Sequence, residues 1–396
     1  MNTIKFFKSP FVAFVACFIF VLGCKEQQDK RFTETMKIEI NNPTDIPFME
    51  LVCEIDTIRL EVTDESIMDN ITQMHIMDDK FYILTNKRSS IHIFDITGKF
   101  ISKIENRGNG PNEYISIFSF KIDKVNKRII LADVFSKKIL IYDEYGNQME
   151  VIKLDFTPSS IVTHNNGFIN INSGPKNSYS DEKMNDYYLH FLDNKGKYIS
   201  SAIKCETKKS IEVTSSFNVD CQENGDILFH PILSNIIYKI DKDSVYARYE
   251  FLNSSNYRFL SQEEKHDFEL IYGERNDMQE KEKERYLLSW GGVIDMDDYI
   301  FFSFSGWEKP HYLYYFKDEK KSLLVDAVNA KGDKVLNEIF LSSPKATYGN
   351  KFFISPNLLI VEKNKGTISN EIINTFFKNT DLESNPILIS FSLKSP

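Results

Sequence analysis

The chain has 396 residues, and its 57 acidic side chains outnumber its 48 basic ones, which gives a formal net charge of −9. Nucleic-acid binding depends on cationic side chains that neutralise phosphates, so we expect no nucleic-acid partner. The 32 Phe and 19 Tyr residues are typical of sheet-rich proteins, because aromatic side chains favour strand surfaces.

The first residues of the chain have the form of a secretory signal. Lys5 and Lys8 precede an apolar run over residues 11–22, and the small Gly23 precedes Cys24. The run is about a dozen residues long, which is short of the roughly 20 that a membrane-spanning helix needs. The N-terminus therefore predicts export.

The end of the apolar run, Val-Leu-Gly-Cys at residues 21–24, resembles a bacterial lipobox. This resemblance implies that Cys24 carries lipid and becomes the first mature residue, so the membrane is a partner through the N-terminal lipid. We expect the cell envelope of a Gram-negative bacterium, with the anchor in the outer membrane and the protein on its periplasmic or surface face. An ordinary cleaved signal with an incidental cysteine is the alternative.

These features divide the chain into three parts. Residues 1–23 are the predicted signal peptide, residues 24–50 a flexible polar tether with Pro43 and Pro47, and residues 51–396 the folded domain. Removal of the signal takes away two lysines and moves the formal charge to −11.

Two neighbouring stretches, residues 79–104 and 126–152, share one pattern. Each has a polar turn, a short apolar strand, a polar gap and a second strand that ends in an aromatic residue and Asp, followed by x-x-Gly. The Asp-x-x-Gly turn occurs three times, with 48 and 50 positions between successive Asp residues: Asp95 to Gly98, Asp143 to Gly146 and Asp193 to Gly196. Asp binds the backbone two residues on and Gly accepts a positive φ, so each turn predicts a hairpin. A period of roughly 40–50 residues indicates an array or propeller of sheets.

Three weaker units follow, with turns near Asn224, Asp297 and Gly349. We therefore predict an all-β fold, a six-bladed β-propeller of four-stranded antiparallel blades. The strand at residues 54–60 has no unit of its own, so we expect it to join the last sheet beside residues 387–391 and close the ring. An open series of sandwiches is the alternative.

One charged segment, around residues 261–290, breaks the strand pattern. Ser261 and Glu264 fit a capping box, so we expect one or two helices inserted between the fourth and fifth units. The insertion would either roof a pocket or shield a sheet edge. A second helix is expected over residues 368–377.

Three cysteines remain in the folded domain, Cys53, Cys205 and Cys221. An odd count without metal-ligand spacing implies no disulfide framework. Cys205 and Cys221 would either pair across a hairpin or stay free thiols.

The segment between the first two units, Arg107-Gly-Asn-Gly-Pro-Asn-Glu-Tyr114, is glycine-rich but leads into a strand. A phosphate cradle would lead into a helix, so nucleotide binding is not expected. An Arg107–Glu113 ion pair that locks the crossing between blades is one interpretation. The other is that the loop lines the mouth of the central channel and presents Arg107 to an anionic ligand. The candidate binding residues of the loop are Arg107, Asn109, Glu113 and Tyr114.

This segment resembles the G-x-G-P-x-E-[YF] loop of the six-bladed β-propeller lipoproteins of Bacteroidetes, which are NHL-like propellers. The match is carried by Arg107, Gly108, Gly110, Pro111, Glu113 and Tyr114. The resemblance implies a fold and a compartment but no substrate. Related propellers include NHL-type interaction modules and some lyases. The helical insertion departs from the pattern of the family.

Trp290 and Trp307 lie beside glycines in predicted loops, and His311 ends the second loop. An exposed Trp offers a flat apolar face to a sugar ring or a partner protein, so these three residues are further binding candidates. Packing of the insertion against the blades is the alternative use of both tryptophans.

No sequence motif predicts a reaction. The chain has no Gly-x-Ser-x-Gly, His-Glu-x-x-His or Walker-type segment, and its seven histidines are scattered. We therefore expect no metal and no cofactor, and we name no catalytic residue. The first hypothesis is a non-catalytic binding or scaffolding module for a peptide, glycan or partner protein.

The alternative is an envelope lyase or hydrolase that acts on a glycan or peptide with residues from several blades around the axis. Histidine, arginine, tyrosine or carboxylate side chains converging on one end of the axis would favour the enzyme. An apolar and neutral lining would favour the binding module.

Overall fold

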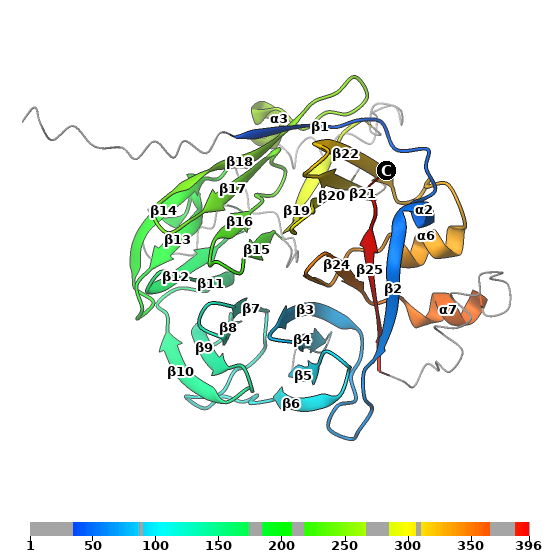
Figure 1. Cartoon of the computed structure of the whole chain (residues 1–396). Helices are drawn as coiled ribbons and strands as arrows, with labels where there is room; N and C mark the ends of the chain where they lie inside the picture. Colours follow the sequence, from blue (N-terminus) through cyan, green and yellow to red (C-terminus); the bar gives the residue numbers. More distant parts are fainter. Residues whose placement is uncertain are drawn as a thin grey trace, which may run out of the picture. The chain divides into compact units, whose positions relative to one another are not determined.

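A computed structural model describes residues 35–85, 87, 90–172, 174, 184–207, 218–266, 285–305, 310–364 and 385–395. The unit that begins at Met36 is a six-bladed β-propeller. The predicted fold class is therefore confirmed. Figure 1 shows the sheets arranged around a common axis, with β3, β7, β15 and β19 nearest the centre.

The first three blades are antiparallel sheets of four strands that follow one another along the chain. Blade 1 contains β3 (Ile71–Met77), β4 (Lys80–Thr85), β5 (Ile91–Asp95) and β6 (Phe100–Ile104). Blade 2 contains β7 (Ser119–Asp123), β8 (Arg128–Asp133), β9 (Lys138–Asp143) and β10 (Gln148–Lys153). Blade 3 contains β11 (Ser160–His164), β12 (Gly167–Ile171), β13 (Tyr187–Leu192) and β14 (Tyr198–Lys204).

Blade 5 is also built from consecutive strands, whereas blades 4 and 6 each add a strand from the N-terminal end of the folded unit. Blade 4 contains β15 (Val219–Cys221), β16 (Ile227–Phe229), β17 (Ile236–Ile240) and β18 (Val245–Leu252), with β1 (Met36–Glu39) as an added parallel strand. Blade 5 contains β19 (Leu288–Asp295), β20 (Tyr299–Ser305), β21 (Pro310–Phe316) and β22 (Lys321–Asp326). Blade 6 contains β23 (Ala346–Tyr348), β24 (Lys351–Ile354), β25 (Ile387–Leu393) and β2 (Val52–Arg59).

The ring closes as predicted, because the early strand β2 completes the last blade. It pairs antiparallel with β25, and Thr57 lies opposite Ile389. Buried apolar residues form six clusters, each between two neighbouring blades. Each blade therefore contacts both of its neighbours.

The three Asp-x-x-Gly turns have the predicted hairpin chemistry. The carboxylate of Asp193 accepts backbone hydrogen bonds from Lys195 and Lys197, at 2.8 and 2.9 Å, and Gly196 has φ +76°. These backbone bonds, first from Lys197 and then from Lys195, lower the pKa of Asp193. The carboxylates of Asp95 and Asp143 accept the equivalent backbone hydrogen bonds in their own turns.

Residues 36–50 were assigned to the flexible tether, but the structure builds them into the propeller. Ile38 of β1 is 1% exposed, and the Thr44 amide donates to the Leu324 carbonyl of blade 5 at 2.8 Å. Helix α2 (Phe48–Leu51) then buries Phe48 completely. The folded unit thus begins at Met36, and this strap of residues 36–51 crosses blades 4, 5 and 6 before β2 begins (Figure 1). Residues 37–40 alternate charged and apolar side chains, which is typical of a strand. Pro43 and Pro47 had favoured the interpretation as a tether.

The described helices are short. Besides α2 they are α3 (Gln262–His266), α6 (Lys334–Phe340) and α7 (Leu358–Asn364). None of the helices in the described ranges has the length and apolar content of a membrane span. Helix α6, which the sequence did not predict, packs Phe340 against Phe391 of blade 6 at 5.4 Å between ring centroids.

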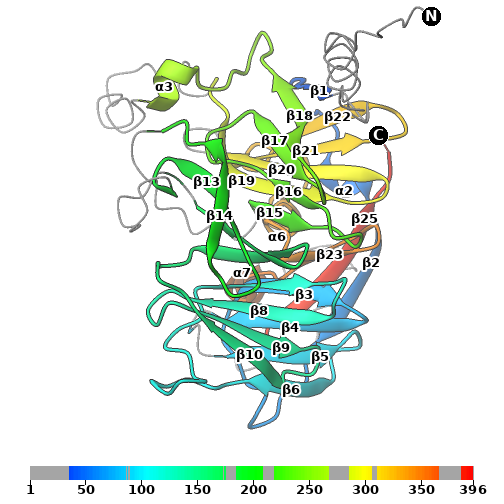
Figure 2. The ribbon, with the colours of Figure 1, turned by 90° about the vertical axis from the view of Figure 1, so that its left-hand side faces the viewer.

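Part of the predicted insertion is confirmed. The Ser261 amide donates to Glu264 and the Glu264 amide donates to Ser261 Oγ, at 2.8 and 3.2 Å, so the capping box is present at α3. Figures 1 and 2 place α3 at the periphery, away from blades 1 and 2. Residues 267–284 and the second predicted helix, 368–377, lie outside the described residues.

The cysteines Cys53, Cys205 and Cys221 are free thiols. The alternative of a Cys205–Cys221 disulfide is therefore wrong.

Candidate functional site

The glycine-rich loop after blade 1 is fastened to blade 2. The Lys138 ammonium donates to the carbonyls of Gly110 and Glu113, at 2.8 and 2.9 Å. The Ile115 amide donates to Asp133 at 2.8 Å. Both partners belong to the β8–β9 hairpin, so the loop lies over blade 2.

The residues of this loop that match the family motif contact one another and fix the shape of the loop. The Glu113 carboxylate accepts a hydrogen bond from the Gly110 amide at 2.7 Å. It also fills the space beside Gly108, where an added Cβ would lie 1.9 Å from Glu113 Oε2. Tyr114 is fully buried and donates its hydroxyl hydrogen to the Ile104 carbonyl at 3.2 Å. The motif thus folds a turn between two blades.

The expected ion pair between Arg107 and Glu113 is not present. Arg107 instead donates from Nε to the Ile115 carbonyl at 3.1 Å, and its guanidinium is otherwise exposed, as is Asn109. None of the loop residues lines the axial cavity or the groove between blades 3 and 4. Ligand binding by Arg107 or Asn109 stays a prediction.

The second group of candidates is not a surface cluster in the described residues. His311 lies in strand β21, is 5% exposed and packs edge-on against Tyr257, at 5.7 Å between ring centroids. Trp290 lies in strand β19, but its side chain is outside the description, as is the whole of Trp307.

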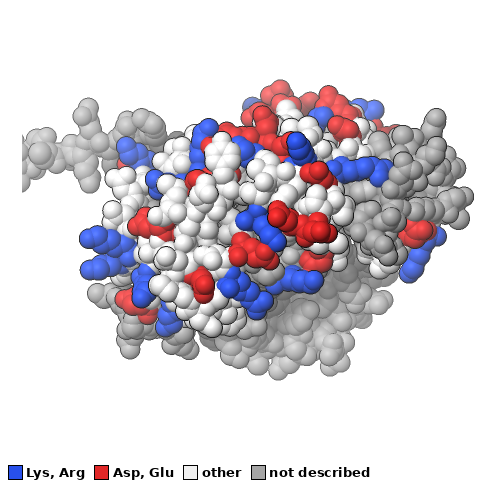
Figure 3. Space-filling model, turned by 90° about the horizontal axis from the view of Figure 1, so that it is seen from below, with Lys and Arg blue, Asp and Glu red and all other residues white. Residues whose placement is uncertain are grey.

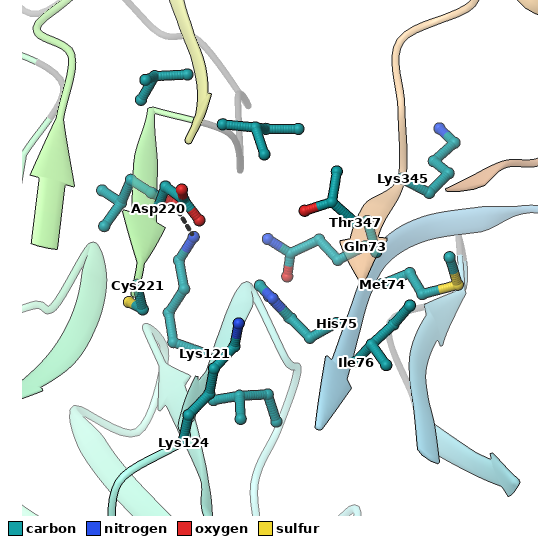
Figure 4. Close-up of a pocket in the computed structure, with 15 residues that line it drawn as sticks. Gln73, Met74, His75, Ile76, Lys121, Lys124, Asp220, Cys221, Lys345 and Thr347 are labelled. Atoms are coloured by element: carbon teal, nitrogen blue, oxygen red, sulfur yellow. Dashed lines mark hydrogen bonds between the residues drawn. The ribbon is translucent and has the colours of Figure 1, made fainter. Parts of the chain in front are cut away.

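The innermost strands instead enclose a cavity of about 60 Å³ on the axis. Strands β3, β7, β15, β19 and β23 contribute to its wall (Figure 4). Its polar lining residues are Gln73, His75, Lys121, Lys124, Asp220, Lys345 and Thr347. Three lysines therefore face one carboxylate in a protein whose net charge is negative.

Burial controls the protonation of this lining. Together with the charges of the nearby Lys121 and Lys124, it lowers the pKa of His75 to about 3, so the imidazole is neutral at pH 7. Burial raises the pKa of Asp220 to about 6, and it lowers the pKa of both Lys121 and Lys345. The Cys221 thiol also stays protonated, because burial raises its pKa to about 11.

A second and larger hollow opens between blades 3 and 4. The groove has a volume of about 670 Å³ and lies among the turns that follow β11, β13 and β17. This volume falls within the range of typical small-ligand sites, which is roughly 300–1,000 Å³.

The groove combines an aromatic wall with polar side chains. His164 and Phe191 pack edge to face at 5.6 Å between ring centroids, and Ile199 beside them is 62% exposed. Asn165 bridges the two blades, because its amide donates to the Lys242 carbonyl at 3.0 Å. Asn166, Asn194, Ser200 and Asp243 line the groove with side chains that form no hydrogen bond to the described residues.

The groove is acidic. Asp193, Asp241 and Asp243 line it with Lys242 as the one cation. The carboxylates of Asp193 and Asp241 accept backbone hydrogen bonds within their own turns. The carboxylate of Asp243 accepts none from the described residues and is available to a ligand. The chemistry of the wall therefore favours a neutral or cationic ligand over an anion.

Elsewhere the charges are mixed. Figure 3 shows acidic and basic side chains interspersed on the face formed by blades 1 and 2, which offers no single-sign surface to a polyanion. Among the described residues, no group of three or more His, Cys, Asp or Glu side chains is placed to hold a metal ion.

Comparison with known proteins decides the family. Residues 33–392 match the family described as "Domain of unknown function (DUF4934)". The chain belongs to this family. None of the curated proteins matches the chain.

Two crystal structures from Bacteroides share the fold of this family member. A Bacteroides fragilis protein described as exported superposes with a TM-score of 0.71 at 14% identity, over 91% of this chain and 100% of the other. A member of the DUF4221 family from Bacteroides vulgatus superposes with a TM-score of 0.54 at 12% identity, over 87% and 99%. These likenesses establish the propeller fold.

Proposed function

We propose that the chain is a lipid-anchored propeller outside the cytoplasm that binds a neutral glycan in the groove between blades 3 and 4, without catalysing a reaction. The main support for glycan binding is the composition of the groove. An exposed aliphatic and aromatic wall lies beside amide, hydroxyl and carboxylate groups that form no hydrogen bond to the described residues. Sugar rings offer apolar faces and many hydroxyl groups, which such a wall complements.

The location is supported by the N-terminus and by a fold relative. Residues 21–24 have the lipobox pattern with Cys24 at its end. The Bacteroides fragilis protein with the same fold is described as exported. Two acyl chains suffice for stable anchoring, whereas one gives reversible binding.

The test of the anchor is metabolic labelling with radioactive palmitate in a Gram-negative host. The wild-type chain should carry label and sediment with outer membranes, and Cys24→Ser should do neither. Equal labelling of the two chains would refute the anchor and leave glycan binding untouched.

The axial cavity does not support the enzyme alternative. We expected His, Arg, Tyr or carboxylate side chains to converge on one end of the axis of an enzyme, and the cavity is lined by His75 and Asp220. A volume of about 60 Å³ holds roughly four waters, however, and a sugar ring is larger. The neutral His75 donates a hydrogen bond from its Nε2 to the Phe120 carbonyl at 3.2 Å, so this proton is already engaged by the backbone.

The binding hypothesis is tested with an array of neutral glycans, acidic glycans and peptides, probed with the detergent-solubilised full chain. We expect retention of neutral glycans, weakened at least about tenfold in an Asn166→Ala/Asn194→Ala variant of unchanged melting temperature. Retention of peptides alone would replace the glycan by a peptide ligand. Retention of acidic glycans alone would contradict the role of the acidic groove.

A further inference from the structure

The axial cavity contains a buried amide that lacks an acceptor. Gln73 is 3% exposed, and its Oε1 accepts a hydrogen bond from the Phe120 amide at 3.1 Å. This bond fixes the orientation of the side chain, so the NH₂ group of Gln73 faces the cavity (Figure 4). No acceptor among the described residues takes its hydrogens, so this group is left to the contents of the cavity.

Further donors line the same space. The Lys121 ammonium is 2% exposed and donates to the Val219 carbonyl at a long 3.4 Å. Lys345 lies at the edge of the cavity with its ammonium directed away from Gln73 (Figure 4), and this ammonium pairs with no carboxylate among the described residues. The hydroxyl of Thr347 lines the cavity too and forms no hydrogen bond to the described side chains or backbone.

Acceptors are few in comparison. Asp220 is the carboxylate that lines the cavity, and its Oδ2 already accepts hydrogen bonds from the Asp295 amide and Gln222 Nε2, at 2.9 and 2.6 Å. Lys124 is neutralised by Glu223, which lies 2.8 Å from its ammonium. If Asp220 offsets Lys121, the charge of Lys345 is still uncompensated within the lining.

A donor-rich and acceptor-poor cavity is suited to an anion. We propose that the axial cavity binds one small inorganic oxyanion of the phosphate or sulfate class, held by Gln73, Lys121 and Thr347, with the unpaired charge of Lys345 at the edge of the cavity. Each oxygen of such an ion accepts several hydrogen bonds, and bonds between charged groups are the stronger ones in a dry site. The volume of about 60 Å³ corresponds to roughly four waters, which suits five compact heavy atoms.

The consequence of binding is mechanical. Gln73 belongs to β3 of blade 1, Lys121 to β7 of blade 2, and Thr347 to β23 of blade 6. Blades 6 and 1 are the pair at which the ring closes. An oxyanion bound between them would link the first and last blades at their inner strands, as β2 links them at the rim.

The test is isothermal titration of the detergent-solubilised full chain with inorganic phosphate at pH 7, at constant ionic strength. We expect one saturable site and a rise in melting temperature of at least about 2 °C. Sodium chloride at the same ionic strength should produce no such rise.

Variants separate this site from general salt effects. Gln73→Glu keeps the acceptor for the Phe120 amide but replaces the inward donor by a carboxylate, so phosphate should bind at least about tenfold more weakly. Lys345→Gln should weaken it as well and serves if Gln73→Glu does not fold. The matched control is Lys124→Gln, which removes a cation of the same cavity that Glu223 already neutralises, and it should change the affinity by less than about twofold.

Three results would overturn the proposal. They are no saturable phosphate heat in the wild-type chain, an equal gain in melting temperature from chloride, and wild-type affinity in both Gln73→Glu and Lys345→Gln. None of these outcomes bears on the glycan groove, because the two hollows share no lining residue.

Discussion

The junction between blades 5 and 6 and the junction between blades 3 and 4 are filled to different extents. The first contains 22 buried apolar residues, to which α2 and α6 contribute Phe48 and Phe340. The second contains 9 among the described residues, and the groove of about 670 Å³ opens beside it. The apolar packing is thus most extensive where α2 and α6 cover blades 5 and 6, and it is smaller at the junction that contains the groove.

The strap of residues 36–51 contributes to this difference in packing between the two junctions. Residues 36–51 add β1 to blade 4, bond to Leu324 of blade 5 and place α2 against blade 6. Blades 1 to 3 have no such cover from the described residues. Truncation of the packing beneath the strap should therefore be more damaging than a change in the exposed groove.

The largest effect is expected for Phe48→Ala. Phe48 is fully buried, and its ring lies 5.7 Å from that of Tyr314 and 6.4 Å from that of Phe391, measured between centroids. The free energy of unfolding should fall by about 3–5 kcal/mol in urea titrations. Ile46→Ala, two residues earlier and 36% exposed, should cost less than about 0.5 kcal/mol. Equal losses would show that the strap is not part of the core.

Gly98→Ala tests the contact between blade 1 and the closing strand β2. Gly98 has φ +90°, and an added Cβ would lie 2.2 Å from the Arg59 carbonyl oxygen. Gly349 also has a positive φ, +56°, but nothing lies within 4 Å of its added Cβ. Gly98→Ala should therefore lower the free energy of unfolding by about 1–3 kcal/mol more than Gly349→Ala does. Equal values would mean that backbone strain alone acts and that β2 is not held by this turn.

Acidification should weaken the ring through His230 of blade 4. Burial lowers the pKa of His230 to about 4, although hydrogen bonds to the Ser234 and Gly292 carbonyls oppose this. The nearby Lys265 and Glu206 act in opposite directions. As the pH falls below about 6.5, the unfolded chain binds this proton first, so the folded state loses about 2 kcal/mol by pH 5.

The measurement is the difference in free energy of unfolding between pH 7 and pH 5, for the wild type and for His230→Gln. The variant should lose about 2 kcal/mol less over this interval. Other groups such as His75 and Asp220 titrate in both proteins and cancel in the comparison. An unchanged pH dependence would mean that His230 is not buried as described.

The smallest stability effects are expected for exposed aliphatic residues at the two junctions. Ile199 in the groove is 62% exposed and Val328 after β22 is 60% exposed. Ile199→Glu and Val328→Glu should each change the free energy of unfolding by less than about 0.5 kcal/mol. A larger loss for Ile199→Glu would mean that the groove is part of the core.

Much of the fold could be predicted from the sequence, because the signals were local. Asp95, Asp143 and Asp193 each bind their own turn, and the closing strand lacked a unit of its own. The strap was not predicted, because β1 is stabilised by a parallel pairing with β18, more than 200 positions away. Helix α6 was missed for the same reason, since Phe340 packs against a distant strand.

The candidate sites were harder to predict. The loop at Arg107 was proposed as a binding loop because of its unusual glycines. In the structure, the hydrogen bonds of Glu113 and Tyr114 hold these glycines in a turn between two blades. Gln73, Lys121 and Thr347 lie in the first strands of three different units, so the cavity is assembled only when the ring closes. The repeat pattern could have identified these cavity residues, because the first strand of each unit lies next to the axis.

The most direct test of the open junction is a titration of the best neutral glycan from the array against Ile199→Glu and Val328→Glu. Ligand binding in the groove predicts that Ile199→Glu binds at least about tenfold more weakly while Val328→Glu stays within about twofold of the wild type. Wild-type affinity in Ile199→Glu, with both variants folded, would contradict it.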